Sequence, residues 1–169
     1  MPTSANASAR VRVEVAVDSV AGARAAESAG ADRIELCIAL GEGGLTPTIG
    51  LLQECKRAVK LPVVAMLRPR AGDFLYDAAE LAVMQRDLAH LAAHGADGVA
   101  VGVLTRDGDL DRTRMKELAE AAAPLPLTCH RAFDLVRDPM LALDQLVELG
   151  IARVLTSGQA ATAVDGATT

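Results

Sequence analysis

Apolar runs alternate with longer amphipathic stretches from residue 11 onward, and this alternation predicts strands and helices in turn. The predicted strands cover residues 11–17, 34–37, 62–68, 99–104, 125–131 and 153–156. A strand followed by a helix recurs about every 30 residues, as expected for parallel strands joined by right-handed crossovers.

Residues that commonly cap helices stand between these strands. The predicted helices begin at Ser19, Thr46, residue 78, Asp111 and Asp138. Thr46 and Asp138 are each followed by a proline, which is favoured at the first helical position. Gly30, Gly95 and Gly150 each follow a predicted helix, where glycine is a common C-terminal signal.

Two architectures fit a repeated strand–helix pattern: an open doubly wound sheet and a (β/α)8 TIM barrel. A doubly wound nucleotide-binding fold usually has a glycine-rich turn after its first strand, and residues 17–20 (VDSV) contain no glycine. We therefore predict an α/β chain of the (β/α)8 TIM-barrel type, with about six βα units over residues 11–169. Residues 1–10 are predicted to be a disordered extension.

Charged residues stand within or at the end of predicted strands, where a parallel sheet should be almost wholly apolar. They are Glu14, Glu35, Arg68, His130 and Arg131. A buried charge is costly unless it is paired or hydrated. Its recurrence in four strands predicts one shared polar site at the carboxyl edge of the sheet, where all strands of a barrel converge.

The overall composition excludes several classes of function. A net charge of −5 and a sequence pI near 5.2 argue against a general nucleic-acid binder. No apolar run approaches the roughly 20 residues of a membrane span, and the small polar leader does not resemble a signal peptide. Three widely spaced cysteines favour a reducing cytoplasm over a disulfide framework.

Residues 125–134 (LPLTCHRAFD) carry the strongest chemical signal. His130 can act as an acid, a base or a metal ligand near neutral pH, and Arg131 and Asp134 are close enough in sequence to orient it. The alternative is a histidine bonded to backbone at a strand end.

Arg68 follows the third predicted strand and offers a planar fork for a carboxylate or phosphate. It could equally form a structural pair with Glu35 or Glu14. The two glutamates lie in adjacent strands, which suits acid–base chemistry or metal binding, but a structural ion-pair network explains them nearly as well.

Cys37 and Cys129 end the second and fifth predicted strands, whereas Cys55 lies on the apolar face of a helix. Thiolates together with the imidazole of His130 would suit a soft ion such as Cu(I). Buried cysteines also occur simply as small apolar residues. All three aromatic residues, Phe74, Tyr76 and Phe133, follow strands three and five, which predicts that they line a pocket.

Five segments together resemble the CutC family of copper homeostasis proteins. They are residues 30–37 (GADRIELC), 42–47 (EGGLTP), 68–74 (RPRAGDF), 130–134 (HRAFD) and 154–158 (VLTSG). The resemblance extends from about residue 13 to residue 166. It implies a cytoplasmic (β/α)8 barrel that is associated with copper handling and forms oligomers.

The resemblance also implies roles for matching positions. It places Glu14, Glu35, Arg68, His130 and Asp134 around the barrel mouth. Cys37 matches a cysteine proposed as a Cu(I) ligand in the family.

This chain departs from the family pattern in two ways. Cys129 stands where the family usually has phenylalanine. Family members also continue through strands seven and eight, whereas this sequence is expected to stop inside a sixth helix at residues 163–169. A six-stranded barrel leaves two unpaired edges, so we expect marginal stability, aggregation or pairing with another chain.

The sequence leaves two functions open. The first is a CutC-like copper homeostasis protein that binds Cu(I) through Cys37, with Cys129 or His130 assisting. The second is a barrel enzyme acting on a small anionic metabolite, in which Arg68 and Arg131 hold the anion while His130 and Glu35 exchange protons.

Overall fold

The computed structural model describes residues 10–168, so the expected N-terminal extension lies outside the described residues except for Arg10. Six strands form one parallel sheet in the order β1-β2-β3-β4-β5-β6. They are β1 (Glu14–Val17), β2 (Arg33–Leu36), β3 (Val63–Met66), β4 (Gly98–Val101), β5 (Leu127–Cys129) and β6 (Arg153–Val154). Since the spatial order follows the sequence order, the sheet has no reversal point of the kind that defines a doubly wound fold. The predicted partial (β/α)8 barrel is confirmed.

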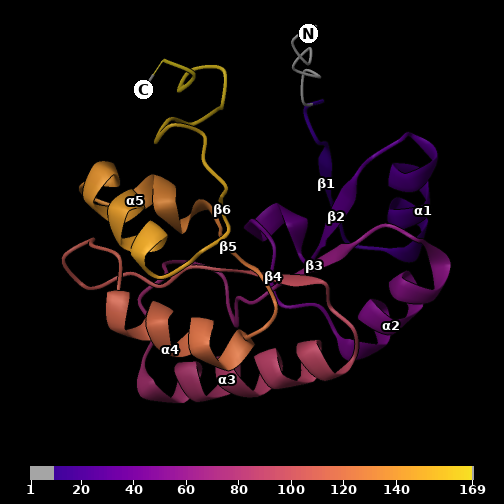
Figure 1. Cartoon of the computed structure of the whole chain (residues 1–169), viewed down its shortest axis with the longest axis horizontal. Coiled ribbons are helices and arrows are strands. Elements are labelled where there is room, and N and C mark those ends of the chain that lie inside the picture. The colour runs from indigo at the N-terminus through magenta and orange to yellow at the C-terminus, as the bar shows by residue number, and fades with distance from the viewer. Residues whose placement is uncertain (1–9, 169) are drawn as a thin grey trace, which may run out of the picture.

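The helices form an arc around the outer face of the curved sheet (Figure 1). They are α1 (Val20–Ser28), α2 (Ile49–Ala58), α3 (Ala78–Ala93), α4 (Arg112–Ala122) and α5 (Pro139–Glu148). Two short 3-10 helices, η1 (Leu40–Glu42) and η2 (Arg131–Leu135), follow β2 and β5. Over residues 10–168, no helix is both long and apolar enough to cross a membrane.

Most predicted helix starts are confirmed by their caps. Ser19 Oγ accepts the Gly22 N–H at 3.1 Å, and Asp138 caps α5 with Pro139 at its start. Asp77 and Glu80 form a reciprocal capping box at the start of α3.

The predicted start of the second helix is wrong by two residues. Thr48 caps α2 by accepting the Leu51 N–H at 3.2 Å, and the helix begins at Ile49. Thr46 Oγ1 instead bonds the backbone N–H and C=O of Arg68, at 2.9 and 3.0 Å. These two bonds join residues that are far apart in the sequence, and they hold the segment before α2 against the loop that follows β3.

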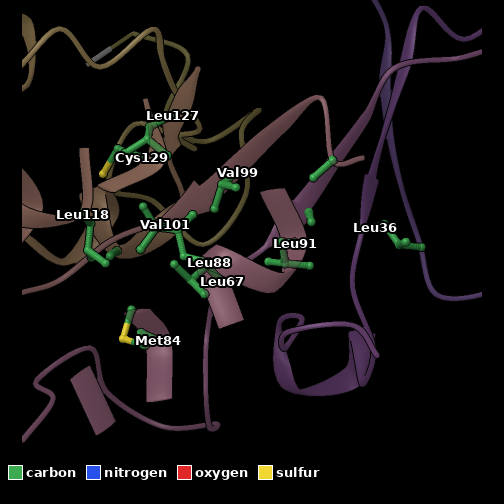
Figure 2. Close-up of a cluster of buried hydrophobic side chains, with 14 of the residues drawn as sticks. Leu36, Leu67, Met84, Leu88, Leu91, Val99, Val101, Leu118, Leu127 and Cys129 are labelled. Atoms are coloured by element: carbon green, nitrogen blue, oxygen red, sulfur yellow. The ribbon is translucent and has the colours of Figure 1, made fainter. Parts of the chain in front are cut away.

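The two faces of the sheet bury different kinds of residue. The helix-facing side carries the main core, which includes Leu36, Val99, Leu118 and Leu127 (Figure 2). The inner face has a separate apolar cluster of only four residues, namely Cys37, Val64, Met66 and Ala100. Burying a Leu or Met side chain stabilises a fold by about 1.5–3 kcal/mol, so the helix-facing core provides most of the apolar stabilisation.

The segment after β6 differs from the expected helix. Residues 163–168 form turns. Val164 is 86% exposed, and Gly166 follows shortly after it, so this segment has no apolar face to pack against the sheet.

Candidate functional site at the carboxyl end of the sheet

A cavity of about 210 Å³, here called the barrel mouth, lies on the inner side of the sheet at the carboxyl ends of the strands. Its charged and polar lining comes from β2, from the loop after β3 and from the loop after β5: Glu35, Arg68, His130 and Arg131. Because Glu35 is the register neighbour of Val64 and Met66 that of Ala100, these positions share the inner face. The structure thus brings together four of the six predicted catalytic residues.

His130 directly follows β5 and is 3% exposed. Its Nδ1 accepts the Ala132 N–H at 3.2 Å, which places the proton of the neutral ring on Nε2. Burial, assisted by the nearby charge of Arg68, lowers the pKa of His130 to about 3. His130 is therefore a neutral imidazole at physiological pH, and its Nε2–H has no hydrogen-bond partner among residues 10–168.

Glu35 lies in β2 with 6% of its surface exposed. Burial raises the pKa of its carboxyl group, although the positive charge of Arg33 opposes this shift. Its Oε2 is buried with no partner in the described part of the chain. A carboxyl group with a raised pKa and an unused oxygen is suited to proton transfer.

Arg68 connects the loops that surround the barrel mouth. Its Nη1 donates to the carbonyls of Glu42 and Gly44, at 2.7 and 3.2 Å, and its Nη2 donates to that of Gly72 at 2.8 Å. The guanidinium carbon lies 4.9 Å from the ring centre of Phe74, a cation–π distance. Arg68 Nε is buried and has no partner within residues 10–168. The expected pairs of Arg68 with Glu14 or Glu35 are not formed there.

Phe74 is the aromatic residue that lines the barrel mouth, and its ring centre is 4.9 Å from that of His130. Tyr76 and Phe133 are each 7% exposed and belong to the helix-facing core. The expected pocket role therefore applies to one of the three aromatic residues.

Gly102 is a site residue that the sequence reasoning missed. A Cβ at this position would lie 2.8 Å from Cε1 and 2.9 Å from Nδ1 of His130. The absence of a side chain here provides the space for the imidazole. The available signal was a glycine directly after the apolar strand β4.

Asp134 has a positioning role in the structure. It accepts hydrogen bonds from Thr156 Oγ1 at 2.6 Å, from Ser157 N at 3.0 Å and from Arg131 Nε at 2.9 Å. Burial alone would raise its pKa, but these bonds and one from the Gln159 N–H lower it to about 2. Asp134 stays ionised and joins η2 to the segment after β6. Thr156 and Ser157, which complete this connection, were not singled out as site residues.

Glu14 lies away from the barrel mouth. It begins β1 and forms an ion pair with Arg33, its register neighbour on β2. The structure thus separates Glu14 from the mouth residues, and its carboxylate is engaged at the opposite end of the strands.

The two candidate metal-binding cysteines face opposite sides of the sheet. Cys37 lines the barrel mouth, where burial raises the pKa of its thiol to about 11. Cys129 lies in the helix-facing core near Leu127 (Figure 2), where burial raises its pKa to about 12. His130 shares the mouth with Cys37 but not with Cys129. No group of three or more His, Cys, Asp or Glu residues within 10–168 is arranged to hold a metal ion.

Two sulfur-bearing side chains, Cys37 and Met66, line one wall of the mouth. Cys37 Sγ and the terminal methyl carbon of Met66 lie 3.2 and 3.3 Å from the point that a Cβ on Gly44 would occupy. A thiolate and a thioether are ligands that select Cu(I). The inner face therefore brings two sulfur-bearing side chains to one wall of the cavity.

Comparisons with known proteins identify the family. The model of the CutC family matches residues 11–169. The chain belongs to the CutC family. It is 52% identical over 154 residues to the human copper homeostasis protein cutC homolog, covering 91% of this chain and 56% of that protein. It is 48% identical to a family protein CutC of Mesorhizobium japonicum, covering 91% of this chain and 60% of that one. The chain thus spans a little over half the length of these relatives.

Solved structures agree with the fold. A candidate copper homeostasis protein CutC from Streptococcus agalactiae superposes with a TM-score of 0.85 at 31% identity, covering 90% of this chain and 75% of that chain. An aldolase named QR15 superposes with a TM-score of 0.61 at 12% identity, covering 94% and 74% of the two chains. The second similarity concerns the barrel architecture alone.

Proposed function

We propose that the chain serves copper homeostasis, as the names of its relatives state, and that its barrel mouth binds a small anionic molecule and exchanges protons with it. One observation carries this proposal. The buried atoms Glu35 Oε2, Arg68 Nε and His130 Nε2 have no partner among the described residues, and the three residues that carry them line one cavity. Leaving such groups unpaired costs about 1–3 kcal/mol each. Ligand oxygens would accept hydrogen bonds from Arg68 and His130, and the proton of a neutral Glu35 or of a ligand hydroxyl would complete the third bond.

Each group has a distinct role in this proposal. Arg68 supplies a permanent positive charge, and the neutral His130 donates its Nε2–H to a ligand oxygen. Glu35 takes up or releases a proton, because its raised pKa brings the titration closer to neutral pH. Arg131 lies half exposed at the rim with its charge matched by Asp134, so Arg68 is the main positive charge available to a ligand. A carboxylate or phosphate group fits this set of donors.

A screen of carboxylates and phosphorylated metabolites by ligand-observed NMR tests this proposal. The informative variants are His130→Gln and Glu35→Gln, which keep the side chains polar and of similar size. His94→Gln is the matched control, because His94 ends α3 on the surface. We expect hits that bind the parent and the control but lose affinity in both mouth variants. Equal binding of every hit to all four proteins would refute the proposal.

A second candidate function is direct Cu(I) binding at Cys37 and Met66, which is favoured by their approach beside Gly44. Binding would require deprotonation of the Cys37 thiol, so affinity should rise with pH. Competition with a chromophoric Cu(I) chelator measures this affinity. We expect weaker binding in Cys37→Ser and Met66→Leu.

Cys129→Ser is the matched control for this experiment, because Cys129 belongs to the helix-facing core. His130→Gln tests whether the imidazole assists. If only Cys129→Ser reduced the affinity, the binding site would lie elsewhere. Unchanged affinity in Cys37→Ser would end the copper-binding candidate and leave the anion proposal standing.

We also propose a homo-oligomer in a reducing, cytoplasmic setting. Within residues 10–168, β1 pairs only with β2, and β6 only with β5, so both outer strands carry unused backbone groups. The three cysteines form no disulfide and are all buried. Light scattering after size-exclusion chromatography would give the mass, and a monomer at micromolar concentration would contradict the oligomer.

A further inference from the structure

A second cavity, of about 330 Å³, lies at the opposite, amino end of the strands. Three arginines line it, namely Arg12, Arg33 and Arg153. Arg153 lies in β6, in register with Thr128 of β5 at one edge of the sheet. Arg33 lies in β2, in register with Glu14 of β1 at the opposite edge. The curvature of the sheet thus brings arginines from its two outermost regions to one cavity. We call this group the basal arginines.

The charges around this cavity do not balance. Glu14 neutralises Arg33 through their ion pair. Arg153 is held by a neutral partner, since its Nε donates to Thr128 Oγ1 at 3.0 Å. Neither Arg12 nor Arg153 forms an ion pair within residues 10–168.

The acidic residues that line the cavity are used elsewhere. Asp32 pairs with Arg10 and accepts the Val13 N–H at 2.7 Å. Asp97 accepts from Lys56 Nζ at 2.5 Å and from the Val63 N–H at 2.7 Å. Both carboxylates thus accept hydrogen bonds from backbone N–H groups at the amino ends of β1 and β3, in addition to their ion pairs. An excess of positive charge remains over the cavity.

The arginines also affect one another. Burial lowers the pKa of Arg33, and the positive charges of Arg153 and Arg12 lower it further. Like charges this close are unfavourable unless an anion lies between them. Guanidinium groups present planar forks of N–H donors that match the oxygens of a phosphate.

We propose that the basal arginines form a second anion site, separate from the barrel mouth, which binds a phosphate group. The cavity is large enough for a phosphate ion or for the phosphoryl end of a phosphorylated metabolite. This proposal does not depend on the function proposed for the mouth, because the two cavities share none of their lining residues.

Isothermal titration calorimetry of the whole chain with inorganic phosphate tests the site, and titration with glycerol phosphate tests the phosphorylated-metabolite source. Arg12→Gln and Arg153→Gln each remove one positive charge. Arg24→Gln is the matched control, because Arg24 is an exposed residue of α1 that does not line the cavity. Loss of one charged hydrogen bond should weaken binding by about tenfold or more.

The mouth variant His130→Gln separates the two sites. We expect phosphate to bind the parent and Arg24→Gln with equal affinity and to bind both basal variants more weakly. In His130→Gln any phosphate bound at the mouth is weakened, so the binding that responds to the basal substitutions should persist in that variant. Arg12 is exposed, so Arg12→Gln should fold even if Arg153→Gln does not. Tighter binding of glycerol phosphate than of inorganic phosphate would indicate that the natural ligand is a phosphorylated metabolite. Equal or weaker binding of glycerol phosphate would indicate the free phosphate ion.

Two results would overturn the proposal. The first is phosphate binding that is lost in His130→Gln and unchanged in the basal variants, which would place the anion at the mouth. The second is no measurable binding to the parent at millimolar phosphate, which would mean that the basal arginines tolerate their mutual repulsion without an anion.

Discussion

The His130 ring packs directly against the backbone of Gly102, in the space that a side chain at position 102 would need. A Cβ added to Gly102 would lie only 2.8 Å from Cε1 of the His130 ring. Ala132 is equally close, with its Cβ at 2.7 Å from the same point. A side chain at position 102 would therefore collide with the ring and displace it.

Gly102→Ala should displace the His130 ring while the chain still folds. We expect a loss of stability of about 1–3 kcal/mol, the usual cost of overpacking, together with weaker ligand binding at the mouth. The NMR signal of the His130 ring would report the displacement. Gly50→Ala is the control, because an added Cβ there meets nothing within 4 Å. An unmoved His130 signal in Gly102→Ala would contradict this steric account.

His130 should make the fold sensitive to mild acid. Its pKa is about 3 in the folded chain against 6.5 for a free histidine, so below pH 6.5 the unfolded chain binds a proton that the folded chain does not. Stability is therefore complete above pH 6.5 and falls by about 1.4 kcal/mol per pH unit as the pH decreases toward 3.

Glu35 acts in the opposite direction over part of this range, because its raised pKa stabilises the folded chain at low pH. The comparison of the parent with His130→Gln isolates the histidine. Urea unfolding between pH 7 and pH 4.5 should show a shallower acid slope in the variant, and parallel slopes would count against a buried neutral His130. Asp134 does not interfere in this range, since its stabilisation is lost only below pH 3.8, toward its pKa of about 2.

Removing the charge of Asp134 should loosen the segment after β6. In Asp134→Asn the side chain loses an acceptor oxygen, so the bonds from Thr156, Ser157 and Arg131 cannot all form. We expect a stability loss of about 2–4 kcal/mol and faster proteolysis after residue 155. Asp144→Asn on the exposed side of α5 is the control. Equal stability of the two variants would show that the network contributes little.

Arg68→Lys should increase the mobility of two loops together. A lysine keeps the positive charge but cannot reach the carbonyls of Glu42, Gly44 and Gly72 in the geometry of a guanidinium. Hydrogen exchange should accelerate at residues 40–45 and 70–74, with a stability loss of about 2 kcal/mol. Arg24→Lys provides the comparison. Faster exchange in only one of the two loops would argue against a shared tether.

The sequence predicts the strands, most caps and the barrel because these depend on local pattern. Ser19 and Asp138 act where their types and neighbours place them. Thr46 does not, because its hydroxyl is engaged by Arg68, a residue distant in sequence. Local preference favours a cap at both Thr46 and Thr48, and a tertiary bond decides between them.

The site residues were predictable to the extent that strand alternation places them. Glu35, Arg68 and His130 meet at the mouth because each lies near the carboxyl end of a strand or just after it, and each faces the inner side of the sheet. Glu14 faces the same side of the sheet but lies two residues closer to the amino end, because the register of β1 with β2 places Ala16, not Glu14, beside Glu35. The space at Gly102 depends on packing between neighbouring strands, which no single-sequence pattern encodes.

The division between a thick helix-facing core and a thin inner cluster has an evolutionary consequence. Apolar packing is concentrated in residues that face the helices, whereas the candidate site residues Glu35 and Cys37 face inward. Neighbouring positions along one strand therefore meet different physical requirements, helix packing on one side of the sheet and the cavity on the other. Substitutions at inner positions can change what the barrel binds while the packing that holds the helices stays intact. New specificities on this scaffold should arise at every second residue of a strand.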